Sequence, residues 1–370
     1  MDAALSQIAE RVRAALADHT PLRLRGGGSK DFHALQLQGD LLDTRDWRGI
    51  VSYEPSELVV TVRAGTPLAE LEAVLAAQGQ CLAFEPPHFG AATVGGMVAT
   101  GWSGPSRASV GAVRDYVLGV EILNGRAELL RFGGQVMKNV AGYDVSRLMA
   151  GSWGTLGLIT EVSLKVLPVA PGETTLRFDG LSQAEALQRL NQWGGQPLPL
   201  NASCWVPDAA GADTGTLYLR LRGARAAVEA ACRSLGGVRL DDAATAADWQ
   251  ACREQTLPWF AQRAADHVLW RLSVPQTAPV LALPHGVGAP LIEWQGGLRW
   301  VQAPRSQGPA LQALAQSVGG SASLFRAESA DQISASPIFD VQNPAVQRIQ
   351  AQLRQAFDPV GIFNPGRTMA

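Results

Sequence analysis

The stretch of residues 93–101, which reads TVGGMVATG, constrains the fold more than any other part of the chain. It carries no charge, is rich in small side chains and contains three glycines. Since Gly95 and Gly96 have no Cβ atom, a rigid anionic ligand can approach the backbone closely there. The stretch predicts a tight turn into a short helix, with free N–H groups facing a phosphate. Taken alone, it is equally compatible with a buried packing turn that holds no ligand.

Two further glycine-rich turns favour the ligand-binding interpretation. Residues 25–29 (RGGGS) follow a short predicted strand, and this order suggests a nest of N–H groups around a diphosphate. This loop has neither the dinucleotide fingerprint nor the Walker pattern, and a flexible hairpin is the alternative for it. Residues 151–161 (GSWGTLGLITE) form the third cluster and lead directly into the apolar alternation of residues 162–166.

Length, charge and cysteine usage limit the possible functions. With 370 residues, 46% of them hydrophobic, the chain can form two or three domains. A net charge of −2 gives no electrostatic basis for binding nucleic acid or an anionic membrane. The four cysteines lack metal-binding spacing, so we expect reduced thiols in a cytoplasmic protein and no iron–sulfur cluster of its own. We expect neither a signal peptide nor a membrane-spanning segment.

The pattern of predicted elements changes near residue 170, where Pro168 and Pro171 mark a boundary. Residues 3–17 have apolar side chains at helical spacing and open the first domain, residues 1–170. Residues 171–335 alternate between predicted strands and helices over short distances. This rhythm predicts an α+β layer, an antiparallel sheet with helices on one face.

Six segments together resemble a known family: residues 25–29, 86–104, 111–115, 138–144, 151–161 and 364–366. Their order and spacing are similar to those of the FAD-binding domain of the vanillyl-alcohol oxidase and p-cresol methylhydroxylase type. Within this family, the chain looks most like the FAD-binding subunits of bacterial glycolate oxidase (glycolate dehydrogenase) complexes. That likeness implies oxidation of glycolate to glyoxylate, a larger flavoprotein subunit as partner, and an iron–sulfur subunit that receives the electrons.

The resemblance implies a two-subdomain α+β fold that holds an extended FAD, a cap domain, and a C-terminal segment, residues 336–370, returning to the FAD domain. The first two turns would hold the pyrophosphate, the third would follow the adenine and ribose, and Gly142 and Tyr143 would lie near the flavin. The residues that it assigns to FAD are Arg25, Gly26, Gly27, Gly28, Ser29, Pro87, Thr93, Val94, Gly95, Gly96, Thr100, Gly101, Gly104, Asp115, Gly142, Tyr143, Gly151, Gly154, Thr155, Gly157, Ile159 and Asn364.

The chain departs from the family pattern at the first and third turns. Family members with a covalent flavin often have a histidine directly after the Arg-Gly-Gly-Gly loop, and Ser29 stands there in this chain. Since a serine hydroxyl cannot replace that nitrogen nucleophile, we expect non-covalent FAD. Trp153 replaces an acidic residue that is common in the third turn.

The predicted cap also departs from relatives that oxidise 2-hydroxy acids. It lacks their His-x-Gly-Asp-Gly-Asn motif and has only His267 and His285, so we expect no metal site and see no obvious general base. Arg271 and Arg326 are the candidate catalytic residues, since a guanidinium can bind a substrate carboxylate through two hydrogen bonds. Ordinary surface or structural arginines are the alternative.

Two other functions remain open at this point. The chain could be a self-sufficient flavin dehydrogenase for another 2-hydroxy acid or an alcohol, or a non-catalytic scaffold subunit that has lost FAD. In the complex, the companion flavoprotein could carry out the substrate chemistry while this chain relays electrons. We expect a cytoplasmic location, at the inner face of the membrane if the partners attach the chain there.

Overall fold

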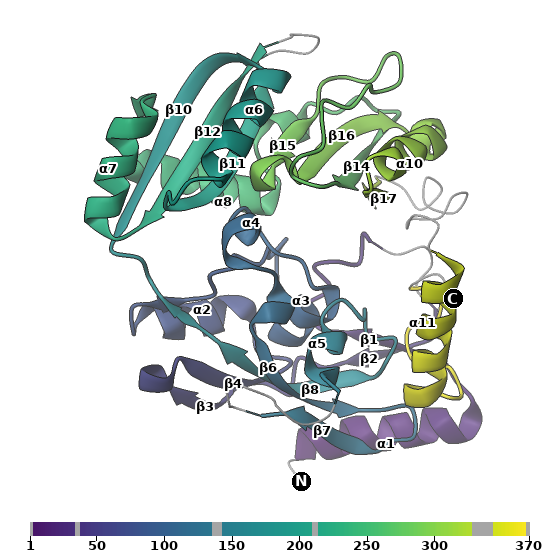
Figure 1. The fold of residues 1–370 in the computed structure, drawn as a ribbon. Helices are drawn as coiled ribbons and strands as arrows, with labels where there is room; N and C mark the ends of the chain where they lie inside the picture. Colours follow the sequence, from purple (N-terminus) through teal and green to yellow (C-terminus); the bar gives the residue numbers. More distant parts are fainter. Residues whose placement is uncertain (1–2, 34–37, 135–142, 209–213, 328–342, 368–370) are drawn as a thin grey trace. The chain divides into compact units, whose positions relative to one another are not determined.

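The computed structural model describes residues 3–33, 38–134, 143–208, 214–327 and 343–367. The chain divides into two compact units (Figure 1). The first unit comprises Met1–Ser103, Ala112–Val169 and Val341–Ala370, and the second comprises Gly104–Gly111 and Ala170–Asp340. None of the helices in the described ranges is long and apolar enough to span a membrane.

The first unit is built on a five-stranded antiparallel sheet with the strand order β3-β4-β8-β6-β7. The strands are β3 (Ile50–Glu54), β4 (Val59–Arg63), β6 (Val117–Leu123), β7 (Leu129–Gly133) and β8 (Leu158–Lys165). Its helices are α2 (Leu68–Ala76), α3 (Val94–Thr100) and α5 (Val145–Met149). Helix α3 contacts β4 and β8, and α5 contacts β6 and β7. The central strand β8 is buried along most of its length.

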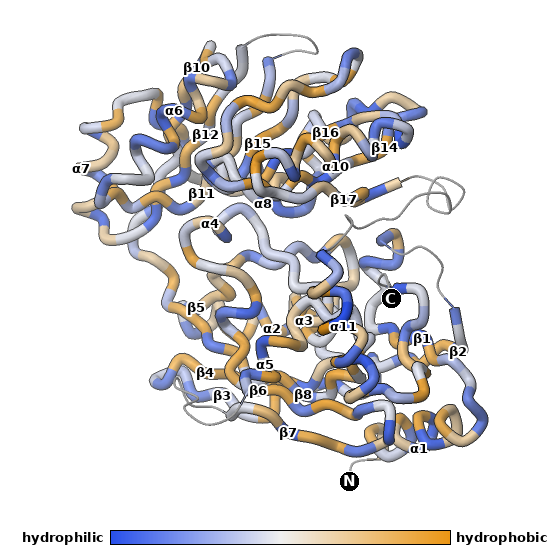
Figure 2. The backbone as a smooth tube through the Cα atoms, turned by 45° about the vertical axis from the view of Figure 1, so that its right-hand side comes forward, coloured by the Kyte–Doolittle hydropathy of each residue, from blue (hydrophilic) through white to orange (hydrophobic). Residues whose placement is uncertain are grey.

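A second layer of the first unit joins both ends of the chain. Helix α1 (Ala3–Asp18) confirms the helix predicted from its apolar spacing, and its two faces differ in hydropathy (Figure 2). It packs against the parallel pair β1 (Leu22–Arg25) and β2 (Asp40–Asp43). The segment after helix α11 (Pro344–Phe357) adds a bridge between Phe363 and β1.

The second unit contains an eight-stranded antiparallel sheet with the order β13-β10-β12-β11-β15-β16-β14-β17. Its strands are β10 (Gly172–Ser182), β11 (Leu200–Pro207), β12 (Thr214–Gly223), β13 (Val238–Arg239), β14 (His267–Ser273), β15 (Leu291–Glu293), β16 (Leu298–Pro304) and β17 (Ser321–Arg326). Its helices are α4 (Arg107–Val110), α6 (Gln183–Gly194), α7 (Arg225–Leu235), α8 (Asp242–Glu254), α9 (Pro258–Ala261) and α10 (Gly308–Ser317).

The prediction that helices cover only one face of this sheet is wrong. Helices α6 and α7 pack on an apolar face that includes Leu176 and Trp205. Helix α8 lies on the opposite face, where Trp249 Nε1 donates a hydrogen bond of 2.9 Å to Thr175 Oγ1. Since neighbouring residues of a strand point to opposite faces, Leu176 faces α6 and α7, whereas Thr175 faces α8.

A row of charged residues crosses the sheet of the first unit. Arg63 lies opposite Glu161, Glu161 opposite Glu121, and Glu121 opposite Arg131. Burial raises the pKa of Glu161, and the Glu121 carboxylate beside it raises this pKa further, against the two arginines. The folded protein therefore binds a proton at Glu161 more tightly than the unfolded chain does.

This arrangement predicts how Glu161→Gln changes the free energy of unfolding with pH. The favourable contribution of Glu161 is present below its unfolded pKa and is lost as the pH rises through the folded value. The variant should therefore be more stable than the wild type at pH 8, by up to about 1 kcal/mol, and nearly equal to it at pH 4. Urea unfolding at both pH values measures this, with the exposed Glu57→Gln as control. An equal effect at both pH values would contradict the prediction.

Candidate functional site

The three glycine-rich turns come together in the first unit, where they line one pocket. The other lining residues come from β1, from the two residues after the first turn, from the positions directly after β2 and β4, Thr44 and Ala64, and from the C-terminal segment. The lining residues are Leu24, Arg25, Gly26, Gly27, Gly28, Ser29, Lys30, Asp31, Thr44, Ala64, Thr93, Gly95, Gly96, Ala99, Thr100, Trp153, Gly154, Gly157, Leu158, Ile159, Asn364 and Arg367.

The first turn lies against the chain that leads into α3. A Cβ atom on Gly27 would lie 1.3 Å from the carbonyl oxygen of Ala91, and one on Gly26 would lie 2.2 Å from Thr93 Oγ1. Both distances are far shorter than any real contact, so these positions require glycine. The hairpin alternative is excluded, because the strand before this turn pairs in parallel with β2.

The backbone of the first turn keeps free hydrogen-bond donors. The N–H groups of Gly27, Gly28 and Ser29 donate to no other residue that the structure describes. Gly28 has a φ of +71°, the left-handed conformation that allows successive N–H groups to converge. Converging N–H groups of this kind form a cradle for an anion.

The expectation of free N–H groups at the second turn is wrong. The N–H of Val94 donates to Thr66 O at 2.9 Å, and that of Gly95 donates to Ala64 O at 2.8 Å. Thr93 caps the helix, and its Oγ1 accepts from the N–H of Gly96 at 3.3 Å. These donors are used inside the fold, because the segment that follows β4 lies directly against the start of α3.

The third turn lies against the C-terminal end of α3. The N–H of Gly151 donates to Val98 O at 3.1 Å, and that of Trp153 donates to Ala99 O at 2.8 Å. Trp153 has a φ of +55°, which a bulky residue rarely adopts. A Cβ atom on Gly154 would lie 2.6 Å from Asn364 Nδ2, so this position also needs glycine.

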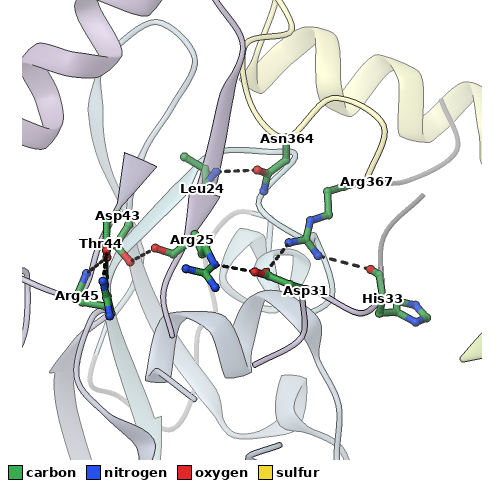
Figure 3. Close-up of polar contacts among 9 residues, drawn as sticks. All are labelled: Leu24, Arg25, Asp31, His33, Asp43, Thr44, Arg45, Asn364 and Arg367. Carbon is green, nitrogen blue, oxygen red and sulfur yellow. Dashed lines mark hydrogen bonds and ion pairs between the residues drawn. The ribbon is translucent and has the colours of Figure 1, made fainter. Parts of the chain in front are cut away.

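Asn364 connects the C-terminal segment to two of the pocket's walls. Its Oδ1 accepts from the N–H of Leu24 at 2.8 Å (Figure 3). Its Nδ2 donates to the carbonyl of Trp153 at 2.7 Å. The buried carboxylate of Asp358 holds the approach to this residue by accepting N–H groups of residues 361–363. The terminal Asn-Pro-Gly turn is therefore part of the pocket.

The charged residues of the pocket are mostly cations. Arg25 Nε lies 2.6 Å from Asp31 Oδ2, and Arg367 NH2 lies 3.6 Å from Asp31 Oδ1 (Figure 3). The Lys30 ammonium donates to the carbonyls of Pro87 and His88 at 3.0 and 2.9 Å. An excess of positive charge at N–H-rich turns suits a polyanionic ligand such as a diphosphate.

The predicted FAD-binding residues divide into three groups. Those in the lining are Arg25, Gly26, Gly27, Gly28, Ser29, Thr93, Gly95, Gly96, Thr100, Gly154, Gly157, Ile159 and Asn364. Those in the first unit but outside this lining are Pro87, Val94, Gly101, Asp115, Tyr143, Gly151 and Thr155. Two remain: Gly142 lies outside the described residues, and Gly104 belongs to the second unit, where its carbonyl accepts from Trp294 Nε1 at 3.0 Å.

Several of these outlying residues have evident structural roles. Asp115 Oδ2 accepts from the N–H of Ala112 at 2.8 Å, and Thr155 Oγ1 donates to Ser152 O at 2.7 Å. Tyr143 differs from these residues, because it is 95% exposed.

Sequence reasoning missed the charged lining residues Lys30, Asp31 and Arg367. The first two directly follow the RGGGS loop, and Arg367 directly follows the Asn-Pro-Gly turn. Their positions directly after recognised motifs are the sequence feature that could have identified them as lining residues.

In the second unit, Arg271 lies against an aromatic ring together with another arginine. The guanidinium carbons of Arg107 and Arg271 lie 4.5 and 5.2 Å from the centroid of the Trp294 ring. Burial, with a smaller contribution from the neighbouring Arg107, lowers the pKa of Arg271 to about 10, although Glu293 opposes the shift. Two cations beside one ring can receive a carboxylate.

Arg326 has different surroundings from Arg271. It lies opposite Leu269 in the β14–β17 pair, whereas Arg271 lies opposite Ser323. Burial lowers the pKa of Arg326, and the neighbouring Arg263 adds to this effect. The two candidate arginines therefore have different charged neighbours.

A cavity of the second unit has the wrong chemistry for a small carboxylate. It has a volume of about 610 Å³, and its lining includes Trp249, Trp259, Tyr218, Asp208 and Asp248. None of its described lining residues is a lysine or an arginine. Nor do the described residues contain a group of three or more His, Cys, Asp or Glu side chains placed to hold a metal ion.

The close approach at Gly27 predicts that Gly27→Ala lowers the free energy of unfolding. The added methyl group must displace the Ala91 carbonyl, and overpacking of this kind costs about 3 kcal/mol. Gly134→Ala is the matched control, because its Cβ atom would meet nothing within 4 Å and its φ is not positive. Thermal and urea unfolding of both variants measure the difference. A Gly27→Ala protein as stable as the control would contradict the described loop geometry.

The comparisons with known proteins agree with this geometry. The family described as "FAD binding domain" matches residues 3–133. A solved alkyldihydroxyacetonephosphate synthase has a TM-score of 0.67 at 17% identity, covering 97% of this chain and 74% of that chain. This likeness concerns the fold alone and confirms the α+β class with a large antiparallel sheet.

The curated relatives identify the family. Glycolate oxidase subunit GlcD of Bacillus subtilis is 32% identical over 127 residues, covering 34% of this chain and 27% of GlcD. D-lactate dehydrogenase of Archaeoglobus fulgidus is 31% identical over 189 residues, covering 49% of this chain and 41% of that protein. Glycolate oxidase subunit GlcE of Escherichia coli K12 is 44% identical over 363 residues, covering 98% of this chain and 96% of GlcE. The chain therefore belongs to the GlcE family of glycolate oxidase subunits, FAD-dependent oxidoreductase subunits with a p-cresol methylhydroxylase-type FAD-binding domain.

Proposed function

We propose that this chain is the FAD-binding subunit of a complex that oxidises glycolate to glyoxylate, and that it holds its FAD without a covalent bond. The observation that carries the proposal is the match to GlcE along nearly the whole chain, at 44% identity. The pocket supports it, because three glycine-rich turns and a surplus of cations meet there. When bound, FAD supplies a hydride acceptor that can pass electrons on one at a time.

The residues of the pocket fit the diphosphate of FAD. The free N–H groups of Gly27, Gly28 and Ser29 would bind phosphate oxygens, while Arg25 and Lys30 would supply positive charge. The missing side chains at Gly154 and Gly157 would allow the adenosine part to lie against the third turn. Ser29 stands where a covalent attachment would need a histidine, which supports a dissociable cofactor.

We also propose a division of the chain into functional domains. We assign residues 1–170 to FAD binding, except for Gly104–Gly111, which belong to the second unit. We assign residues 171–335 to a cap that binds substrate or partner, and residues 336–370 to a segment that completes the FAD domain. The remaining residues assigned to FAD in this domain, including Pro87, Asp115 and Gly142, would support FAD binding from outside the pocket lining.

The expected partners are a larger FAD-containing subunit and an iron–sulfur subunit. The name of GlcE describes a subunit, and the match to GlcD over 127 residues is consistent with two related chains. The four cysteines of this chain lack cluster spacing, so the electrons would leave through an iron–sulfur cluster of a partner. We place the complex in the cytoplasm, with any membrane attachment made through the partners.

The pair Arg107 and Arg271 favours a second function, a flavin dehydrogenase that binds its own 2-hydroxy acid. Both guanidiniums lie on the Trp294 ring, where a substrate carboxylate could bind. Arg326 is the other candidate for this role. In this alternative the purified chain would oxidise substrate without its partners.

The cofactor proposal predicts that the purified chain is yellow and that acid precipitation leaves the colour in the supernatant. A visible spectrum and flavin extraction measure both properties. A precipitate that retains the yellow colour would contradict the non-covalent assignment. A colourless chain that takes up no added FAD would favour the non-catalytic scaffold.

Anaerobic addition of glycolate then separates the two functions. In the proposed complex, glycolate should bleach the flavin absorbance of the assembled subunits and leave that of the chain alone nearly unchanged. Rapid bleaching of the isolated chain by glycolate or D-lactate would instead favour the self-sufficient enzyme.

If Arg271 binds the substrate carboxylate, Arg271→Gln should raise the KM for glycolate of the assembled complex by about 10-fold or more, because a charge-assisted pair is lost. The exposed Arg233→Gln is the control. Since the pKa of Arg271 is about 10, the cation persists at pH 7–9, and KM should rise only as the pH passes about 10. An unchanged KM in Arg271→Gln would remove Arg271 from the substrate site.

A further inference from the structure

The C-terminal segment brings a cation into the pocket of the first unit. Arg367 lies three residues beyond Asn364, which is fixed to Leu24 and Trp153 by two hydrogen bonds. Its side chain is 9% exposed and lines the pocket, where both Arg367 and Arg25 lie next to Asp31 (Figure 3). The anchored turn therefore holds the guanidinium in place beside the glycine-rich loop.

The polar contacts of Arg367 are incomplete. NH2 lies 3.6 Å from Asp31 Oδ1, and NH1 lies 3.5 Å from the carbonyl oxygen of His33, at the outer limit of a hydrogen bond. Nε is buried and has no partner among the described residues. A guanidinium has five N–H donors, and leaving them unmet in a buried place is costly.

The charge of the pocket is also incomplete. Among the residues that the structure describes, its charged lining residues are three cations, Arg25, Lys30 and Arg367, and one carboxylate, Asp31. Asp31 is held more closely by Arg25, at 2.6 Å, than by Arg367. Lys30 is turned to two backbone carbonyls. The surplus of two positive charges matches the roughly two negative charges of a diphosphate, and Arg367 is the one of these cations whose buried Nε has no partner among the described residues.

On the basis of the proposed function, we propose that Arg367 is an FAD-binding residue whose guanidinium pairs with a phosphate of the cofactor. The C-terminal segment and the bound cofactor then hold each other in place. Bound FAD satisfies Arg367, and Arg367 in turn holds the segment that carries Asn364 against β1 and the third turn. By linkage, whatever stabilises this contact stabilises both the bound cofactor and the docked chain end.

This role has a signature that a merely structural role lacks. Without FAD, Arg367 is an under-satisfied buried charge, so Arg367→Gln should leave the thermal midpoint unchanged or raise it. With FAD, the same variant should lose part of the stabilisation that the cofactor gives the wild type. An arginine that only supports the fold would lower both midpoints equally.

The experiment uses the full chain purified with its FAD, in the wild type, Arg367→Gln, Arg367→Lys and the control Arg45→Gln. Arg45 is an exposed arginine that pairs with Asp43 and does not line the pocket (Figure 3). The rise of flavin fluorescence on dilution gives the release rate, and titration of the FAD-depleted protein gives the Kd. We expect a Kd about 10- to 100-fold higher for Arg367→Gln, and an intermediate value for Arg367→Lys.

Four further results bear on the proposal. Arg367→Gln should show a weaker dependence of the Kd on salt, because one phosphate–cation contact is gone. FAD should slow the tryptic cut after Arg367 in the wild type. The same Kd in Arg367→Gln and Arg45→Gln would overturn the role of Arg367 and leave the proposed function intact. A wild-type chain that binds no FAD would overturn both.

Discussion

The pocket of the first unit depends on one close backbone contact. The chain at Gly26 and Gly27 lies so near Ala91 and Thr93 that a side chain at either glycine would overlap them. This contact brings the turn after β1 against the turn before α3. The free N–H groups of the first turn are a consequence, because the loop is held by packing and its donors remain available. The proposed cofactor site could not form without it.

The same contact explains why the first and second glycine-rich turns differ in their free N–H groups. Helix α3 uses its first N–H groups on carbonyls of the segment at Ala64 and Thr66. Its last carbonyls accept from the turn at Gly151 and Trp153. The helix is therefore fixed at both ends by hydrogen bonds within the fold. Helix α3 forms one side of the pocket, and the N–H groups that can bind an anion lie in the neighbouring first turn.

Electrostatics completes the site from two ends of the chain. Arg25 and Lys30 come from the first loop, and Arg367 comes from the C-terminal segment. Asp31 is the single carboxylate among them, and it keeps the arginines in place without neutralising the pocket. Positive charge that the protein leaves uncompensated is available to a ligand, which is why the pocket fits a diphosphate.

The sequence by itself determined the family pattern, the α+β class, the three glycine-rich turns and the serine that argues against a covalent flavin. These features are local, because each depends on residue type and short spacing. Only the tertiary structure decided which donors stay free, since the partners of Gly95 lie some thirty residues away in the chain, at Ala64. It also decided that Gly104 belongs to the second unit and that Arg367 and Arg25 meet at the same carboxylate, Asp31. Such outcomes depend on contacts between distant segments, and spacing along the chain carries no information about them.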